Sequence, residues 1–196
     1  MNVNDLDRRD FYRIDDLIHL IHTPIDPDHA SGNPYDERYP IPREALLVSQ
    51  LQTINNDNRD LLRLVGDSNR ALGNYLRSID EKIKLLAQYI ASDDPELQQK
   101  VPVTLSEGGL SFYSGELLEI GTCLHLVIVL FPKINAIAAI GTVKTNEKLE
   151  EHPTLYRLGV EFTSLNEADR KQLVRHIRRL ESQGIREQGQ NSTNNN

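Results

Sequence analysis

The sequence of 196 residues contains a single cysteine, Cys123, a single methionine and no tryptophan. One cysteine cannot form a disulfide within the chain, and such sparse use is typical of proteins in a reducing compartment. No apolar run approaches the roughly 20 residues that a membrane-spanning helix needs, and the N-terminus is charged. We therefore expect a soluble, cytoplasmic protein with no membrane span.

Positive charge is also scarce, because 22 Lys and Arg residues stand against 29 Asp and Glu residues, a net charge of -7. This balance argues against a general nucleic-acid binder, which the phosphate backbone would repel. The sequence has no P-loop glycine pattern, no GxSxG motif and no histidine or cysteine spacing typical of zinc. We expect neither an enzyme nor a protein with a metal or a cofactor.

Period-two patterns predict a small antiparallel β-barrel. The first strand is expected over 14–22, and residues 23–42 form an irregular connection because prolines recur there. Two strands flank the turn at Gly108–Gly109, because glycine tolerates positive φ, and further strands are expected over 123–131, 134–144 and 155–162. The apolar segment Cys123–Phe131 should lie in the core.

A terminal helix is expected after Ser164, because Ser164 and Glu167 have the spacing of a capping box. This helix should cover one end of the barrel. The tail, residues 183–196, is polar and rich in asparagine, so we expect it to be disordered.

Between 47 and 90 the apolar pattern changes to a heptad repeat, within a helical insertion that we place at 43–92. A single helix of this length would extend about 65 Å, too far for a small barrel to cover. We therefore predict a coiled-coil homo-oligomer, a tetramer or a dimer, with Asn58 setting the register. Gly66 and Gly73 leave open the alternative of a helix that breaks and folds back. The residues assigned to oligomerisation are Leu47, Leu51, Ile54, Asn58, Leu61, Val65, Leu72, Tyr75, Ile79 and Leu86.

Two short motifs point to a ligand. Arg9-Asp10-Phe11-Tyr12-Arg13 has the form RxxxR just before the first strand, and Thr104-Leu105-Ser106-Glu107-Gly108-Gly109 nearly has the form (D/N)xSxxG. The segment Tyr156–Phe162 has the pattern of a closing strand. In this order, the three segments resemble the PilZ domain family, over residues 8–22 and 100–182, although the inserted 23–92 exceeds the family's usual spacing.

The resemblance implies a six-stranded barrel that binds cyclic di-GMP, a bacterial second messenger, and acts as a signalling receptor or adaptor through a downstream protein that the sequence does not name. Arg9 and Arg13 would hold guanine edges and phosphates, Arg8 would add a third cation, and Ser106 and Gly109 would shape the pocket. A guanidinium suits this ligand, because it presents paired donors to guanine O6 and N7.

Thr104 departs from the motif, since the family has Asp or Asn there. A threonine hydroxyl cannot accept from guanine N1–H and N2–H₂ together, and the lost pair costs about 1–3 kcal/mol. We therefore expect weak binding. The alternative is a degenerate PilZ scaffold that does not bind the nucleotide and works by oligomerisation and protein–protein interaction.

Overall fold

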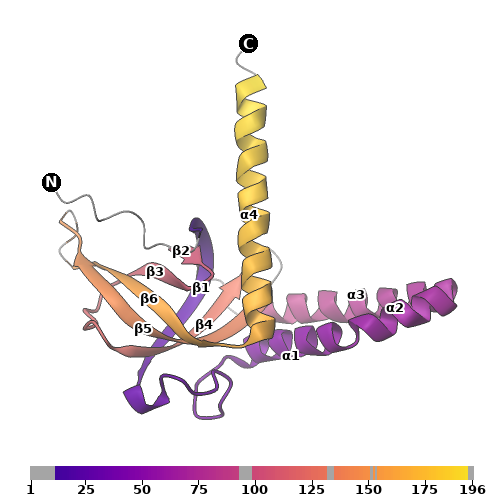
Figure 1. The fold of residues 1–196 in the computed structure, drawn as a ribbon, viewed down its shortest axis with the longest axis horizontal. Helices are drawn as coiled ribbons and strands as arrows, with labels where there is room; N and C mark the ends of the chain where they lie inside the picture. The colour runs from indigo at the N-terminus through magenta and orange to yellow at the C-terminus, as the bar shows by residue number, and fades with distance from the viewer. Residues whose placement is uncertain (1–11, 93–98, 132–134, 151, 153, 194–196) are drawn as a thin grey trace, which may run out of the picture.

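The computed structural model describes residues 12–92, 99–131, 135–150, 152 and 154–193. Six antiparallel strands close into a barrel in the order β1-β2-β3-β6-β5-β4, which confirms the predicted fold (Figure 1). The first strand pairs with both β2 and β4, so the N-terminal segment closes the barrel. The strands are β1 (Ile14–Ile25), β2 (Val101–Ser106), β3 (Gly109–Ser114), β4 (Cys123–Leu130), β5 (Asn135–Lys148) and β6 (Tyr156–Leu165).

The strand β4 is buried along its whole length, which explains its uninterrupted apolar sequence. Side chains such as Leu126 and Ile128 alternate into the barrel core. Val127 and Val129 point outward and pack with Val48 of helix α1 (Arg43–Asp57) in a second apolar cluster. The two faces of β4 therefore join the barrel to the helical insertion.

The insertion is a helical hairpin rather than one continuous helix. Helices α1 and α2 (Arg59–Ser68) lead away from the barrel, and α3 (Arg70–Ser92) returns beside them (Figure 1). The reversal occurs at Asn69, whose backbone is extended and whose Oδ1 accepts from the Leu72 N–H at 3.1 Å. This is the folded-back alternative that the two glycines left open.

Gly66 and Gly73 make the reversal possible because they meet where α2 and α3 pack together. A Cβ added at Gly73 would lie 2.6 Å from the Gly66 Cα, closer than real Cβ atoms approach.

Asn58 lies between α1 and α2, at φ −87° and ψ −3°, and is exposed.

The hairpin does not bury the predicted oligomerisation seam. Leu72 is 46% exposed and Leu86 is 63% exposed. Ile54, Leu61 and Tyr75 are exposed as well, whereas Leu47, Leu51, Val65 and Ile79 are half-buried. Folding back therefore leaves an apolar surface on both arms of the hairpin.

Helix α4 (Glu167–Thr193) covers one end of the barrel, where Leu173 and Ile177 join the core, and then projects away (Figure 1). The capping-box prediction is wrong, because the helix begins at Glu167 and the Ser164 hydroxyl donates to the Gly32 carbonyl at 2.8 Å. The helix also continues to Thr193, so residues 183–193 of the tail are helical, and the prediction of a disordered tail is wrong for these residues. Extending an existing helix adds one hydrogen bond per residue fixed, which favours continuation.

The connection after β1 is anchored by side chains that the proline count did not reveal. The strand runs through Pro24 to Ile25, and a short 3₁₀ helix, η1 (Pro27–His29), follows. His125 of β4 stacks on Tyr39 at 4.4 Å, and its Nε2 lies 2.9 Å from the Pro34 carbonyl oxygen. The connection therefore covers the outer face of β4.

Tyr35 ties this connection to three other elements. Its hydroxyl donates to Asp169 Oδ2 of α4 at 2.8 Å, and accepts from Ser49 Oγ of α1 at 2.9 Å and from the Ala138 N–H of β5 at 3.2 Å. Burial raises the pKa of Asp169 to about 6, and burial together with Asp169 raises the pKa of Tyr35. This network fixes the hairpin, the barrel and α4 to one another.

No helix within the described residues is long and apolar enough to cross a membrane.

Candidate ligand-binding site

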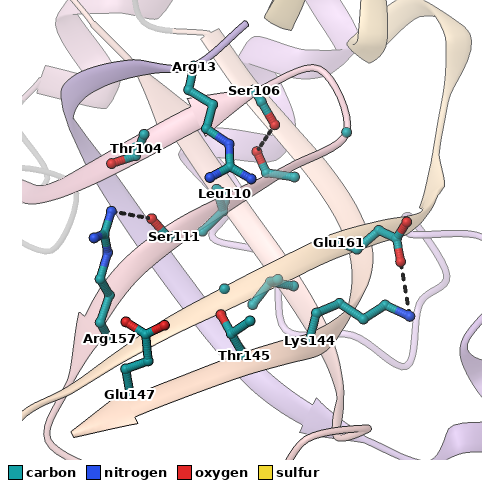
Figure 2. Close-up of a pocket in the computed structure, with 14 residues that line it drawn as sticks. Arg13, Thr104, Ser106, Leu110, Ser111, Lys144, Thr145, Glu147, Arg157 and Glu161 are labelled. Carbon is teal, nitrogen blue, oxygen red and sulfur yellow. Dashed lines mark hydrogen bonds and ion pairs between the residues drawn. The ribbon is translucent and has the colours of Figure 1, made fainter. Parts of the chain in front are cut away.

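A hollow of about 780 Å³ lies on the outer face of the barrel (Figure 2). It extends over β2, β3, β6 and β5, with Arg13 entering from the start of β1. Its lining residues are Arg13, Thr104, Ser106, Gly108, Gly109, Leu110, Ser111, Lys144, Thr145, Glu147, Arg157, Gly159, Val160 and Glu161.

The strand register sets a row of polar side chains across this face. Thr104 pairs with Ser111, Ser111 pairs with Gly159, and Gly159 pairs with Thr145. The residues on either side of Thr104 and Ser111, such as Val103 and Phe112, point into the core, because side chains alternate along a strand. The barrel thus offers a flat surface of hydroxyls with no bulky residue at its centre.

Glycines at the centre of this surface have no side chain that would project over it. A Cβ at Gly159 would lie 2.4 Å from Thr145 Oγ1, and a Cβ at Gly109 would lie 2.1 Å from the Val160 carbonyl oxygen. Among the described residues the glycine with positive φ is Gly121, so Gly109 is required for this close approach and not for positive φ. Ser106 Oγ donates to the Gly109 carbonyl at 3.0 Å and holds the turn between β2 and β3.

The hollow carries cations at two of its edges. The Arg13 side chain is exposed near Ser106, and Arg157 lies at another edge with its Nη2 3.5 Å from Ser111 Oγ (Figure 2). Lys144 is engaged by Glu161, with Nζ and Oε2 3.0 Å apart. Two guanidinium groups facing one hollow suit a ligand with phosphates and guanine edges, because each presents paired donors.

The structure brings together four of the predicted ligand-binding residues, Arg13, Thr104, Ser106 and Gly109. The other two, Arg8 and Arg9, lie outside the described residues. Sequence reasoning missed Arg157, although it alternates with Gly159 and Glu161 on the outward face of the predicted closing strand. That alternation was the available signal, but only the pairing of β6 with β3 shows which site Arg157 joins.

Within the described part of the chain, no three His, Cys, Asp or Glu side chains are grouped to hold a metal ion. The hollow is lined by hydroxyl groups, guanidinium groups, carboxylates and exposed backbone of the barrel.

The PilZ domain family model matches residues 81–179, half of the sequence, and the chain belongs to this family. The match begins within α3 and leaves out β1 and the RxxxR motif, which the inserted helices separate from the rest of the barrel. PilZ domains are in general non-enzymatic adaptor domains that bind cyclic di-GMP.

One solved structure is similar over nearly the whole chain. It is a pathogenic protein from Xanthomonas campestris, described as a tetrameric PilZ domain self-assembled through an unusual helical bundle. The two chains are 14% identical, 90% of each is covered, and the TM-score is 0.57. At this identity the likeness shows the fold.

The Bacillus subtilis inhibitor of motility is 19% identical over 43% of each chain, with a TM-score of 0.38. No curated protein sequence matches the chain significantly.

Proposed function

We propose that this protein is a cyclic di-GMP receptor that acts as an adaptor and assembles through its helical hairpin. The observation that carries the first part is the convergence of Arg13, Thr104 and Ser106 on one hollow, with Arg157 facing them. Arg13 directly precedes β1, Thr104 and Ser106 lie on β2, and Arg157 lies on β6, so three segments that are distant in the sequence line one hollow.

Arg13 is the residue most suited to grip the nucleotide. Its guanidinium is exposed beside the hydroxyl row and can donate two parallel hydrogen bonds to guanine O6 and N7 or to a phosphate. Arg8 and Arg9 precede it in the sequence and would add further donors. Arg157, at another edge of the hollow, suits a second phosphate or the face of a base.

We expect the affinity to be micromolar or weaker. Thr104 occupies the motif position where an Asp or Asn side chain would accept from guanine, and a hydroxyl provides a single acceptor atom. The lost hydrogen-bond pair costs about 1–3 kcal/mol.

Calorimetric titration with cyclic di-GMP tests the receptor. Arg13→Ala should cost about 1.5–3 kcal/mol of binding free energy, as expected for a charge-assisted hydrogen bond. Arg63→Ala, which removes an exposed arginine from α2 away from the hollow, should bind like the wild type. Equal losses in both variants would point to general electrostatic attraction and would contradict the proposed site.

The apolar surface of the hairpin favours a second function, that of an oligomeric scaffold. Leu61, Leu72 and Leu86 are exposed on it, and exposed apolar side chains gathered on one element are typical of protein–protein contacts. The Xanthomonas protein of the same fold is described as a tetramer assembled through a helical bundle. We propose that this chain forms a dimer or tetramer in the same way.

Light scattering coupled to size exclusion tests the assembly. Leu72→Asp with Leu86→Asp should reduce the mass to that of a monomer, because assembly would bury two unpaired charges. The matched control, Gln50→Asp with Arg63→Asp, changes exposed polar positions on the same hairpin and should leave the mass unchanged. A monomeric wild type at micromolar concentration would end the oligomer proposal, whereas an oligomer without nucleotide binding would favour the scaffold.

A further inference from the structure

Thr104 does not stand alone at its motif position. The β1–β2 register places Asp15 directly opposite it, and the Thr104 hydroxyl donates to Asp15 Oδ1 at 2.7 Å. Asp15 is exposed, so its carboxylate is available to a ligand. Where the motif has one acidic or amide side chain, this chain therefore has a hydroxyl and a carboxylate in contact.

Asp15 extends the polar row of the binding surface by one strand. The row reads Asp15, Thr104, Ser111, Gly159 across β1, β2, β3 and β6. A second hollow of about 630 Å³ includes Asp15 and shares Thr104, Ser111 and Arg157 with the first. The carboxylate thus borders the same surface that Arg13 and Arg157 face.

Guanine requires acceptors on its Watson–Crick edge, where N1–H and N2–H₂ point side by side. A carboxylate has two oxygens and about four lone-pair sites, so the bond from Thr104 leaves both oxygens able to accept. We propose that Asp15 is the residue that reads this edge of guanine, with Thr104 acting as the donor that holds its carboxylate in place. This proposal rests on the proposed cyclic di-GMP receptor.

The other carboxylates at the hollow are less suited to this role. Glu161 is already paired with Lys144, with an N–O distance of 3.0 Å. Glu147 lies on β5, on the far side of the hollow from Thr104 (Figure 2). Asp15 follows Arg13 by two residues, so one chain segment supplies a donor fork for O6 and N7 and an acceptor pair for N1–H and N2–H₂.

The consequence is selectivity between purines. Adenine presents the lone pair of N1 where guanine has N1–H, so it would face the carboxylate oxygens with an acceptor. Asp15 therefore disfavours a cyclic di-adenosine ligand, and it partly offsets the acceptor that Thr104 lacks.

The test measures binding of two ligands to the full chain by calorimetry: cyclic di-GMP and its inosine analogue, which lacks the 2-amino groups. The wild type should prefer cyclic di-GMP. Asp15→Ala should weaken cyclic di-GMP binding by about 5- to 150-fold, and should bring the two ligands to similar affinity. Asp67→Ala, which removes an exposed carboxylate from α2, is the matched control and should keep the preference. Glu147→Ala tests the other unpaired candidate at the hollow, and we expect it to keep the preference as well.

Each other outcome overturns the inference. If Asp15→Ala keeps the wild-type preference, or weakens both ligands by the same factor with a lowered melting temperature, Asp15 has only a structural role while the receptor stands. If Glu147→Ala abolishes the preference, Glu147 is the acceptor. If the wild type binds neither ligand, the receptor and the role of Asp15 fail together.

Discussion

The carboxyl group of Asp169 gives the clearest prediction about stability. Its side chain is buried, with 4% of the residue exposed, and it accepts from the Tyr35 hydroxyl at 2.8 Å. Burial raises its pKa from 3.8 to about 6. The native protein therefore holds a proton that the unfolded chain has already released between these two pH values.

The direction of the pH effect follows from that difference. Below pH 3.8 both states are protonated and the contribution of Asp169 to stability is fully present. As pH rises through about 6, the native state must ionise a buried carboxyl group, and the contribution is lost. At about 1.4 kcal/mol per pKa unit, the shift amounts to about 3 kcal/mol.

Asp169→Asn should remove this loss, because the amide keeps the shape, still accepts from Tyr35 and does not ionise. At pH 8 we expect the free energy of unfolding to rise by up to about 3 kcal/mol, whereas at pH 4 it should change little. Urea denaturation at both pH values measures the effect, at one protein concentration because assembly also shifts stability. Asp67→Asn, on the exposed surface of α2, should show no such dependence.

A loss of stability in Asp169→Asn at pH 8 would refute the reasoning. It would mean that the fold stabilises the ionised carboxylate, through its hydrogen bonds, more than burial penalises it.

Two further predictions concern the site and the hairpin. Thr104→Asp should weaken cyclic di-GMP binding, because the new carboxylate would lie against Asp15, although the motif alone suggests tighter binding. Thr104→Asn should avoid this repulsion, and calorimetric titrations of the two variants compare their affinities. Gly73→Ala should destabilise the protein by about 1–3 kcal/mol in thermal unfolding, since the Cβ of the new alanine would overlap Gly66. Gly184→Ala in α4 should stabilise the protein by about 1 kcal/mol, because there is open space around Gly184. Equal effects of the two glycine substitutions would argue against a close α2–α3 contact.

The barrel was predictable from the sequence because its strands alternate in the usual way and β4 is apolar throughout. The hairpin was not, because a glycine costs a helix only about 1 kcal/mol and both a straight and a folded helix remain possible. What decides between them is the contact between Gly66 and Gly73, which is tertiary.

The candidate site likewise contains residues that the sequence could predict and residues that it could not. Arg13, Thr104 and Ser106 belong to local motifs, so the types and spacing of these residues were enough to predict that they lie at one surface. Asp15 and Arg157 lie beside Thr104 and Ser111 only through the pairing of β1 with β2 and of β3 with β6. A short motif contains residues that are close along the chain. The residues that complete the surface come from other strands, and their position beside the motif depends on strand order.

The closure of the barrel by its first strand also sets the order in which a newly synthesised chain can mature. Ile14 pairs with Leu105 and His19 pairs with Val129, so β1 must wait for partners made much later. The α2–α3 reversal at Asn69 needs only its own neighbours, and short loops close faster than long ones. The contacts of the α2–α3 reversal can therefore form before Arg13 reaches its place beside β2, and under the proposed function assembly through the hairpin does not have to wait for the binding surface.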